Sequence, residues 1–526
     1  MKKLHTRLAV CVVCAAMLTT LAACGGNNTN GGNSAASNAG TNSGSNAGAN
    51  AGKEETKAEP TDITITTITF AESPPNDLEA IKQINEKLNI NLKVNYIPAN
   101  NITEKLTALL AGNNLTDVMF VEDLNLTPTY ANAIDQGAFW DLTDFIKDYP
   151  NLAAYPENIW SNVKYKGKIM SLPRVRPLNG QSALMFRQDW LDKLGLKAPS
   201  TMEELDKVLT AFTQNDPDGN GKNDTYGAVF MGSPNPNLPY YMFGTGTNWK
   251  DDGSGALIPD WWTPQFKDNL AFFSEEFKKG NIIPDMPVLK SVQVKENILQ
   301  NKAGMWYGNV NDGWNFQFEL NKTNKDAVIK AYPFPAAADG KTYYNEAPGF
   351  YGQLFVSKKV SEEKLKKILE FYDYTATKEG YDLISYGIKD KDYTVDEAGF
   401  ITQTDAGKAA GYGQTNQMLS GYFNEYGRAE AAGMPADVRE YNHQLVDSIK
   451  PNAVADPTYG LPATDGFKER GADWNKKRFD MIVNVIIGQS SLEDWDKFVE
   501  TFKNDANFKK HVEDTNAMYK EKTSQQ

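Results

Sequence analysis

A run of oxygen-bearing side chains between residues 216 and 227 is the strongest chemical signal in this sequence. The segment has aspartate or asparagine at positions 1, 3, 5 and 9 and glycine at position 6, as in the calcium loop of an EF-hand. Position 12 is Gly227 instead of a bidentate glutamate, so we expect a weakened structural Ca²⁺ site, with a metal-free polar turn as the alternative. The predicted ligands are the side chains of Asp216, Asp218, Asn220 and Asp224 and the backbone carbonyl of Lys222.

Aromatic side chains gather in predicted loops, where they could stack on the apolar faces of sugar rings. These residues are Trp249, Trp261, Trp262, Trp306, Tyr307 and Trp314. The segment 306–314 also contains Asn309 and Asp312, which can form hydrogen bonds with sugar hydroxyls. The alternative for each tryptophan is ordinary packing in the core.

The first 23 residues have the pattern of a secretory signal peptide. Three basic residues precede an apolar run over 8–18, which is too short to span a membrane, and small residues follow it. The sequence Leu-Ala-Ala-Cys at 21–24 resembles the lipobox of bacterial lipoproteins, in which the cysteine thiol is lipidated and becomes the N-terminus. We therefore predict lipidation of Cys24 and anchoring at the extracellular face of the cell membrane, with an ordinary cleaved signal as the alternative.

Composition constrains the rest of the chain. Residues 24–60 are rich in Asn, Gly, Ser and Ala, which predicts a disordered stalk. Cys11 and Cys14 would leave with the signal peptide, so the folded part would have no disulfide. The net charge of −13 argues against nucleic acid as a partner. The folded part far exceeds the ~250–300 residues at which one core stops growing, which predicts two lobes.

Strands and helices alternate at the start of the folded part. Hydrophobic periodicity predicts strands over 63–70, 91–96 and 117–121, separated by helices over 77–88 and 103–111. This βαβαβ order predicts a parallel sheet covered on both faces. Further along, a strand leads into a helix over 184–194, and Thr201 and Glu204 have the spacing of a capping box.

The sequence contains no motif that indicates catalysis. It has neither a nucleophile elbow nor an H-E-x-x-H zinc helix. His5 would leave with the signal peptide, and His443 and His511 are predicted on polar helical faces. Acidic residues are abundant, so a carboxylate pair for polysaccharide hydrolysis keeps a secreted enzyme as an alternative.

Short phrases over most of the folded part resemble the family 1 extracellular solute-binding proteins, which serve bacterial ABC importers and include alginate- and maltose-binding proteins. The matched phrases lie at 109–112, 117–120, 165–169, 172–173, 184–201, 356–359, 371–374, 379–380 and 386–388. Their order along the chain makes the resemblance specific.

The resemblance implies a periplasmic-binding-protein-like α/β fold, with two discontinuous α/β lobes, a multi-strand hinge and a ligand cleft that closes on its solute. It assigns 61–175 plus 350–410 to the first lobe and 176–349 plus 411–526 to the second, on which helices over 474–487 and 492–502 should pack. It implies a monomeric, lipid-anchored binding component that captures an oligosaccharide for ABC permease subunits. A surface sensor or adhesin with the same fold is the alternative.

The resemblance also places residues near the ligand, at the expected crossings between lobes. Arg174 and Arg176 could clamp a uronate carboxylate or pair with acids of the protein itself. Glu346 and Tyr351 flank the crossing at 348–349, and Trp474 begins a helix that often faces the cleft in this superfamily. In related alginate-binding proteins the calcium loop has an acid directly after its ninth position. The equivalent residue here is Thr225, which we add to the predicted calcium ligands.

Overall fold

The computed structural model of the protein describes residues 59–122, 126–397, 399–431 and 433–524. The predicted signal peptide, Cys24 and nearly all of the predicted stalk lie outside the described residues. The described part forms one compact unit. Within these ranges, none of the helices is both long enough and apolar enough to cross a membrane.

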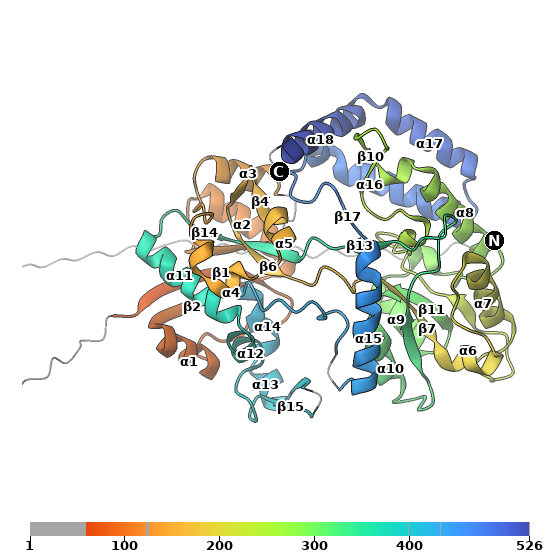
Figure 1. Cartoon of the computed structure of the whole chain (residues 1–526), viewed down its shortest axis with the longest axis horizontal. Coiled ribbons are helices and arrows are strands. Elements are labelled where there is room, and N and C mark those ends of the chain that lie inside the picture. Colours follow the sequence, from red (N-terminus) through yellow and green to blue (C-terminus); the bar gives the residue numbers. More distant parts are fainter. Residues whose placement is uncertain (1–58, 123–125, 398, 432, 525–526) are drawn as a thin grey trace, which may run out of the picture. The chain divides into compact units, whose positions relative to one another are not determined.

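A five-stranded sheet has the strand order β2-β1-β3-β14-β6. Figure 1 labels β1, β2, β6 and β14 of this sheet. Its strands are β1 (Thr61–Thr69), β2 (Ile90–Pro98), β3 (Val118–Val121), β6 (Leu172–Val175) and β14 (Phe350–Val356). β1 pairs in parallel with β2 and β3, so the parallel pairing predicted for the first strands of the folded part is confirmed. β14 enters antiparallel between β3 and β6, which the local sequence pattern did not indicate.

Helices cover this sheet by burying amphipathic faces. On α1, the buried residues Ala80, Ile81, Ile84 and Leu88 follow the three-to-four spacing of one helical face. The helices of this part are α1 (Glu79–Leu88), α2 (Ile102–Ala111), α3 (Pro128–Asp135), α4 (Pro150–Ala153), α5 (Glu157–Val163), α11 (Glu362–Thr375), α12 (Lys378–Tyr386), α13 (Asp405–Ala409) and α14 (Tyr412–Thr415). One hydrophobic core, drawn from 63–175 and 350–419, joins the sheet to these helices, except α13 and α14, which contribute no residue to it.

A second sheet has four strands in the order β12-β7-β11-β8. Its strands are β7 (Ala183–Arg187), β8 (Tyr226–Ala228), β11 (Ala303–Gly308) and β12 (Ile329–Tyr332). The helices of this part are α6 (Gln188–Leu194), α7 (Met202–Gln214), α8 (Pro264–Lys278), α9 (Ser291–Leu299), α10 (Asp312–Leu320), α15 (Ala436–Ile449), α16 (Asp465–Ile486), α17 (Leu492–Asn504) and α18 (Ala506–Ser524). A separate core, drawn from 183–344 and 429–508, holds them together.

Side-chain caps mark where two helices packed on the second core, α7 and α16, begin. Thr201 accepts a hydrogen bond from the backbone of Glu204 (3.2 Å), as predicted, but the Glu204 carboxylate accepts from Ser200 (2.8 Å). Thr464 caps α16, so this helix begins at Asp465 and the predicted start at Trp474 is wrong.

Short hairpins and strand pairs complete the fold. They are β4 (Lys164–Tyr165) with β5 (Lys168–Ile169), β9 (Trp249–Asp251) with β10 (Leu257–Pro259), β13 (Tyr344–Glu346) with β17 (Ala453–Ala455), and β15 (Tyr393–Val395) with β16 (Ile401–Gln403).

Three chain segments cross between the two cores, and backbone hydrogen bonds join them. The Val175 amide donates to the carbonyl of Ser420 (2.8 Å), and the Arg176 amide donates to the carbonyl of Gly349 (2.7 Å). The Ala347 amide donates to the carbonyl of Leu178 (2.8 Å). The crossings at 172–182, 344–350 and 419–431 therefore form one bonded strip, called the crossing strip below.

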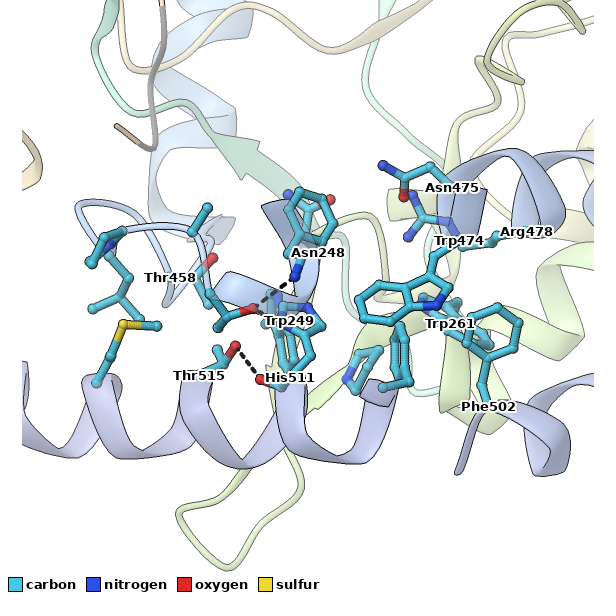
Figure 2. Close-up of a pocket in the computed structure, with 18 residues that line it drawn as sticks. Asn248, Trp249, Trp261, Thr458, Trp474, Asn475, Arg478, Phe502, His511 and Thr515 are labelled. Atoms are coloured by element: carbon cyan, nitrogen blue, oxygen red, sulfur yellow. Dashed lines mark hydrogen bonds between the residues drawn. The ribbon is translucent and has the colours of Figure 1, made fainter. Parts of the chain in front are cut away.

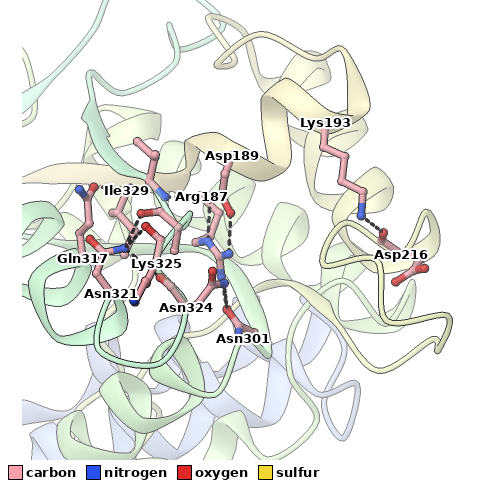
Figure 3. A network of polar contacts seen from close by, with 12 residues as sticks. Arg187, Asp189, Lys193, Asp216, Asn301, Gln317, Asn321, Asn324, Lys325 and Ile329 are labelled. Atoms are coloured by element: carbon pink, nitrogen blue, oxygen red, sulfur yellow. Dashed lines mark hydrogen bonds and ion pairs between the residues drawn. The ribbon is translucent and has the colours of Figure 1, made fainter.

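A buried ion pair stands at the end of β7 (Figure 3). Arg187 is 1% exposed and donates to Asp189 through Nε (2.9 Å) and Nη2 (2.6 Å). Its Nη1 donates to Oδ1 of Asn301 (2.6 Å), and its guanidinium lies 4.6 Å from the Trp190 ring centroid. Each guanidinium nitrogen thus has a partner, as a buried cation requires.

Candidate functional site

An aromatic cavity of about 230 Å³ lies among the C-terminal helices and the β9–β10 hairpin (Figure 2). Its walls come from β9, the loop 458–464, α16, α17 and α18. Three predicted ligand residues, Trp249, Trp261 and Trp474, line it. The structure therefore brings together tryptophans that are up to 225 residues apart in the sequence.

Helical spacing explains why these rings meet. On α18, Phe508, His511 and Thr515 are separated by three and four residues, so they lie on one helical face. The His511 ring centroid is 5.3 Å from that of Trp249 and 5.6 Å from that of Trp474. Trp474 also meets Phe508 edge to face at 4.9 Å. Such contacts fix the ring planes that a sugar could stack on.

His511 is part of the wall of the aromatic cavity. The prediction that it lies on a polar helical face is wrong, because its side chain is 8% exposed. Its Nδ1 is hydrogen-bonded to the Thr464 hydroxyl (2.6 Å), and burial lowers the pKa of His511 to about 4. The imidazole is therefore uncharged at neutral pH.

Arg478 supplies positive charge at the aromatic cavity, and the buried Asp260 attracts it. Nε of Arg478 is buried, with no hydrogen-bond partner within the described part of the chain. Burial lowers the pKa of Arg478, and attraction to Asp260 opposes this shift. Asp260 accepts a hydrogen bond from the Gly246 amide (3.0 Å), and burial raises the pKa of Asp260 to about 7. The aromatic cavity thus combines apolar ring faces with a guanidinium group, one nitrogen of which has no hydrogen-bond partner in the described part of the chain.

The other predicted aromatic residues lie outside the lining of the aromatic cavity. Trp262 is half-buried beside Trp261, with ring centroids 5.8 Å apart. Trp306 is 1% exposed and stacks on Phe316 (5.3 Å), because this face of β11 is turned to the core. Trp314 is half-buried on α10.

Tyr307, Asn309 and Asp312 form hydrogen bonds with nearby residues of the protein. The Tyr307 hydroxyl is 3.2 Å from that of Ser182. Asp312 accepts hydrogen bonds from the backbone (2.8 Å) and side-chain (3.2 Å) nitrogens of Asn309, and burial raises the pKa of Asp312. These contacts shape the turn between β11 and α10.

The predicted arginines lie at a second cavity, of about 470 Å³, beside the crossing strip. The Arg174 and Arg176 guanidinium carbons are 5.7 and 5.6 Å from the ring centroid of Tyr351, whose hydroxyl donates to Glu122. Glu346 lies apart from them and accepts a hydrogen bond from Asn158 (2.7 Å).

The predicted calcium loop is organised around Asn220. Its amide nitrogen donates to Asp218 (2.8 Å) and Asp224 (3.0 Å), so one group holds two carboxylates together. Asp216 accepts backbone hydrogen bonds from Gly219, Asn220 and Gly221, and Lys193 donates to the Asp216 carbonyl (3.2 Å; Figure 3). Burial, together with the neighbouring carboxylates, raises the pKa of Asp218. The backbone amide of Lys222 donates to the side-chain oxygen of Asn220 (2.7 Å).

Thr225 is directed away from this loop. It is 3% exposed, and its hydroxyl donates to the carbonyl of Phe212 (2.8 Å). Over the described ranges, no group of three or more His, Cys, Asp or Glu side chains is arranged to hold a metal ion.

Sequence reasoning missed two arginines, Arg478 in the aromatic cavity and Arg428 in the second cavity. Arg478 did not stand out because charged helical residues usually face solvent, whereas Arg428 lies in a turn without a recognisable motif. A signal for Arg478 was available, because it follows Trp474 by four residues and so shares its helical face.

The fold is that of the periplasmic-binding-protein-like solute-binding proteins. The chain belongs to the bacterial extracellular solute-binding protein family, whose model matches residues 71–382. It is 32% identical over 447 residues to the polygalacturonan/rhamnogalacturonan-binding protein YtcQ of Bacillus subtilis, covering 83% of this chain and 87% of that protein. It is 26% identical over 445 residues to lipoprotein LipO of the same organism, covering 82% and 87%.

A solved structure supports the same fold. The alginate-binding protein AlgQ2, solved without calcium ion, superposes with a TM-score of 0.65 at 17% identity and covers 88% of this chain and 99% of that chain.

Proposed function

We propose that this protein captures an extracellular oligosaccharide and presents it to an ABC importer, without chemical turnover. The aromatic cavity is the observation that supports this most directly, because stacked rings beside polar groups suit the two faces of a sugar. Similarity to a polygalacturonan/rhamnogalacturonan-binding protein over most of both chains supports a plant-polysaccharide fragment as the ligand.

The position of the aromatic cavity favours closure around a ligand. Leu461, Pro462 and Met518 line it and also line a neighbouring cavity of about 330 Å³. The far wall of that neighbouring cavity includes Ser161 and Lys164, which belong with the first sheet. A ligand longer than one sugar ring would thus contact both cores and favour the closed state.

We propose the two-lobe division on the same basis. The two separate hydrophobic cores support lobes made of 61–175 plus 350 onward, and of 176–349 plus the C-terminal part. Met418 and Leu419 pack in the first core, which favours a last boundary near 419 instead of the predicted 410. The crossing strip would act as the hinge.

Isothermal titration calorimetry with oligosaccharides released from polygalacturonan and rhamnogalacturonan tests the proposed function. Trp474→Leu keeps apolar bulk but removes the ring plane, so it should weaken binding about three- to tenfold. Trp314→Leu, outside the aromatic cavity, is the matched control. If no oligosaccharide of either kind binds the wild-type protein, the proposed function is wrong.

We further propose that Cys24 is lipidated and anchors the protein outside the cell membrane. The lipobox pattern supports this, as does the similarity to a protein named as a lipoprotein. Cys24→Ser should release the protein into the medium, whereas Cys14→Ser should not. Retention of the Cys24 variant on membranes would rule out this anchor.

A structural Ca²⁺ in the loop 216–224 is the last part of the proposal. Three carboxylates and an amide lie in one short loop, and hard oxygen ligands suit this ion. In the described structure these carboxylates are not arranged as a metal site, so binding would require the loop to rearrange. AlgQ2, which shares this fold, has been solved in a form distinguished by the lack of a calcium ion, and this adds support. Asp216, Asp218 and Asp224 would hold the ion, with Asn220 turning its amide oxygen inward. The ion would stabilise the loop, which lies outside the lining of both cavities described above.

A further inference from the structure

The second cavity contains an unusual concentration of positive charge for an acidic protein. It is lined by Arg174 and Arg176 from the first crossing and by Arg428 from the third. The chain as a whole has a net charge of −13. Three guanidinium groups therefore converge in one cavity, although the surrounding protein is rich in carboxylates.

These arginines are not neutralised by the protein. Across the described ranges, none of the three forms an ion pair with an acidic side chain. Arg174 is 3% exposed, and its Nε and Nη1 have no hydrogen-bond partner there. Its Nη2 donates to the carbonyl of Asn416 at 3.3 Å, and Arg176 donates to the carbonyl of Val175 at 3.2 Å. Arg187, equally buried, has the full set of partners that Arg174 lacks.

The acids in the wall of the second cavity already have partners. Asp382 pairs with Lys378 (2.5 Å), and Glu430 is held by His443 (2.9 Å) and Asn424 (2.9 Å). Burial lowers the pKa of Arg174, and the charge of Arg176 lowers it further. Burial also lowers the pKa of Arg176, and the charge of Arg428 adds to that shift. A buried cation without a counter-ion is costly, so an external anion would relieve Arg174, and the half-buried Arg176 and Arg428 would add to the attraction.

The remaining lining narrows the kind of anion. Tyr381, Tyr386, Phe400 and Tyr422 contribute ring surfaces, which an inorganic ion would leave unused. The amide of Gln417 has a buried oxygen without a partner in the described structure, which can accept from a hydroxyl. Guanidinium groups match a carboxylate with two parallel hydrogen bonds. Charge, rings and amide together suit a carboxylated sugar.

We propose that this second cavity is a binding site for the carboxylate of a uronate sugar, separate from the aromatic cavity. The inference rests on the proposed oligosaccharide-binding function and makes the substrate class acidic. Arg174 and Arg176 would bind the carboxylate, and Arg428, on the third crossing, would add a third positive charge beside it. The tyrosine rings would contact the sugar ring.

Calorimetry of the purified full-length protein with trigalacturonate and with its fully methyl-esterified form tests this inference. The ester keeps the sugar chain and removes its charge, so it should bind at least about tenfold more weakly. Arg176→Gln and Arg428→Gln should each reduce trigalacturonate affinity by about tenfold and leave the ester unaffected. Arg470→Gln, an exposed arginine of α16 outside both cavity linings, should leave both affinities unchanged.

Two results would overturn the inference while leaving the proposed function standing. One is equal affinity for the acid and the ester. The other is displacement of trigalacturonate by millimolar phosphate or sulfate that also binds alone, which would identify a general anion site. Failure of every oligosaccharide to bind would instead contradict the proposed function itself.

Discussion

Replacing Arg174 by methionine should stabilise the protein when no anion is present. The change removes two buried nitrogens that lack partners, each worth about 1–3 kcal/mol. It also removes the long hydrogen bond to Asn416 and the contact with Tyr351. Their loss destabilises the protein and offsets part, but not all, of the stabilisation. Even for buried ion pairs, replacement by apolar side chains of similar volume is often neutral or stabilising by about 1–4 kcal/mol. We expect a net stabilisation of about 1–2 kcal/mol.

Arg187→Met is the matched control for this experiment. Arg187 is as buried as Arg174, but it is bonded to Asp189 and Asn301, so its loss leaves a carboxylate uncompensated. We expect destabilisation of about 3 kcal/mol. The two variants should therefore change the free energy of unfolding in opposite directions, although both replace a buried arginine by methionine.

Equilibrium urea unfolding followed by tryptophan fluorescence measures both variants, first in low-salt buffer and then with trigalacturonate. Ligand should stabilise the wild-type protein and have a smaller effect on Arg174→Met. A loss of more than about 1 kcal/mol for Arg174→Met without ligand would refute the reasoning, because Arg174 would then be satisfied in the free protein.

Three further predictions concern pH, the aromatic cavity and calcium. Burial raises the pKa of Asp260 to about 7, whereas an aspartate in the unfolded chain titrates near ~3.9. Between these two pH values the folded state binds a proton that the unfolded state does not, so stability should fall as pH rises from about 4 to about 7. Melting temperatures measured from pH 4 to 8 should show this fall, and Asp260→Asn should make it less steep. Trp474→Leu should reduce the ligand-induced change in tryptophan fluorescence as well as the affinity, and an unchanged response would place the ligand elsewhere. Ca²⁺ should raise the melting temperature and EDTA should reverse this; Asp218→Asn should abolish the response, and a wild-type melting curve indifferent to both additions would argue against the calcium loop.

Local patterns were sufficient for the opening of the fold. The strands and helices between residues 61 and 121 follow from periodicity, because each buries one face against its sequence neighbours. The position of β14 was beyond such reasoning. This strand pairs with β3 and β6, which lie roughly 170 to 240 residues earlier, and pairing at that distance leaves no local signal.

In the candidate site, too, residue types could be predicted from the sequence, but contacts between distant segments could not. Trp249 and Trp474 were identified by residue type, but their meeting depends on the packing of α16 and α18. His511 was assigned to a polar face because its buried partner, Thr464, is 47 residues away. Trp306 was misleading for the opposite reason, since a tryptophan near glycines in a supposed loop proved to be a core residue of β11.

The strand order of the first sheet also constrains when this protein can fold. β6 pairs only with β14 among the described strands of its sheet, so residues 172–175 stay without a neighbour until residue 356 has been made. The Thr67 hydroxyl likewise waits for the carbonyl of Gln417, 350 residues later. Most of the chain must therefore be made before the first sheet is complete, so completion of this sheet depends on long-range contacts.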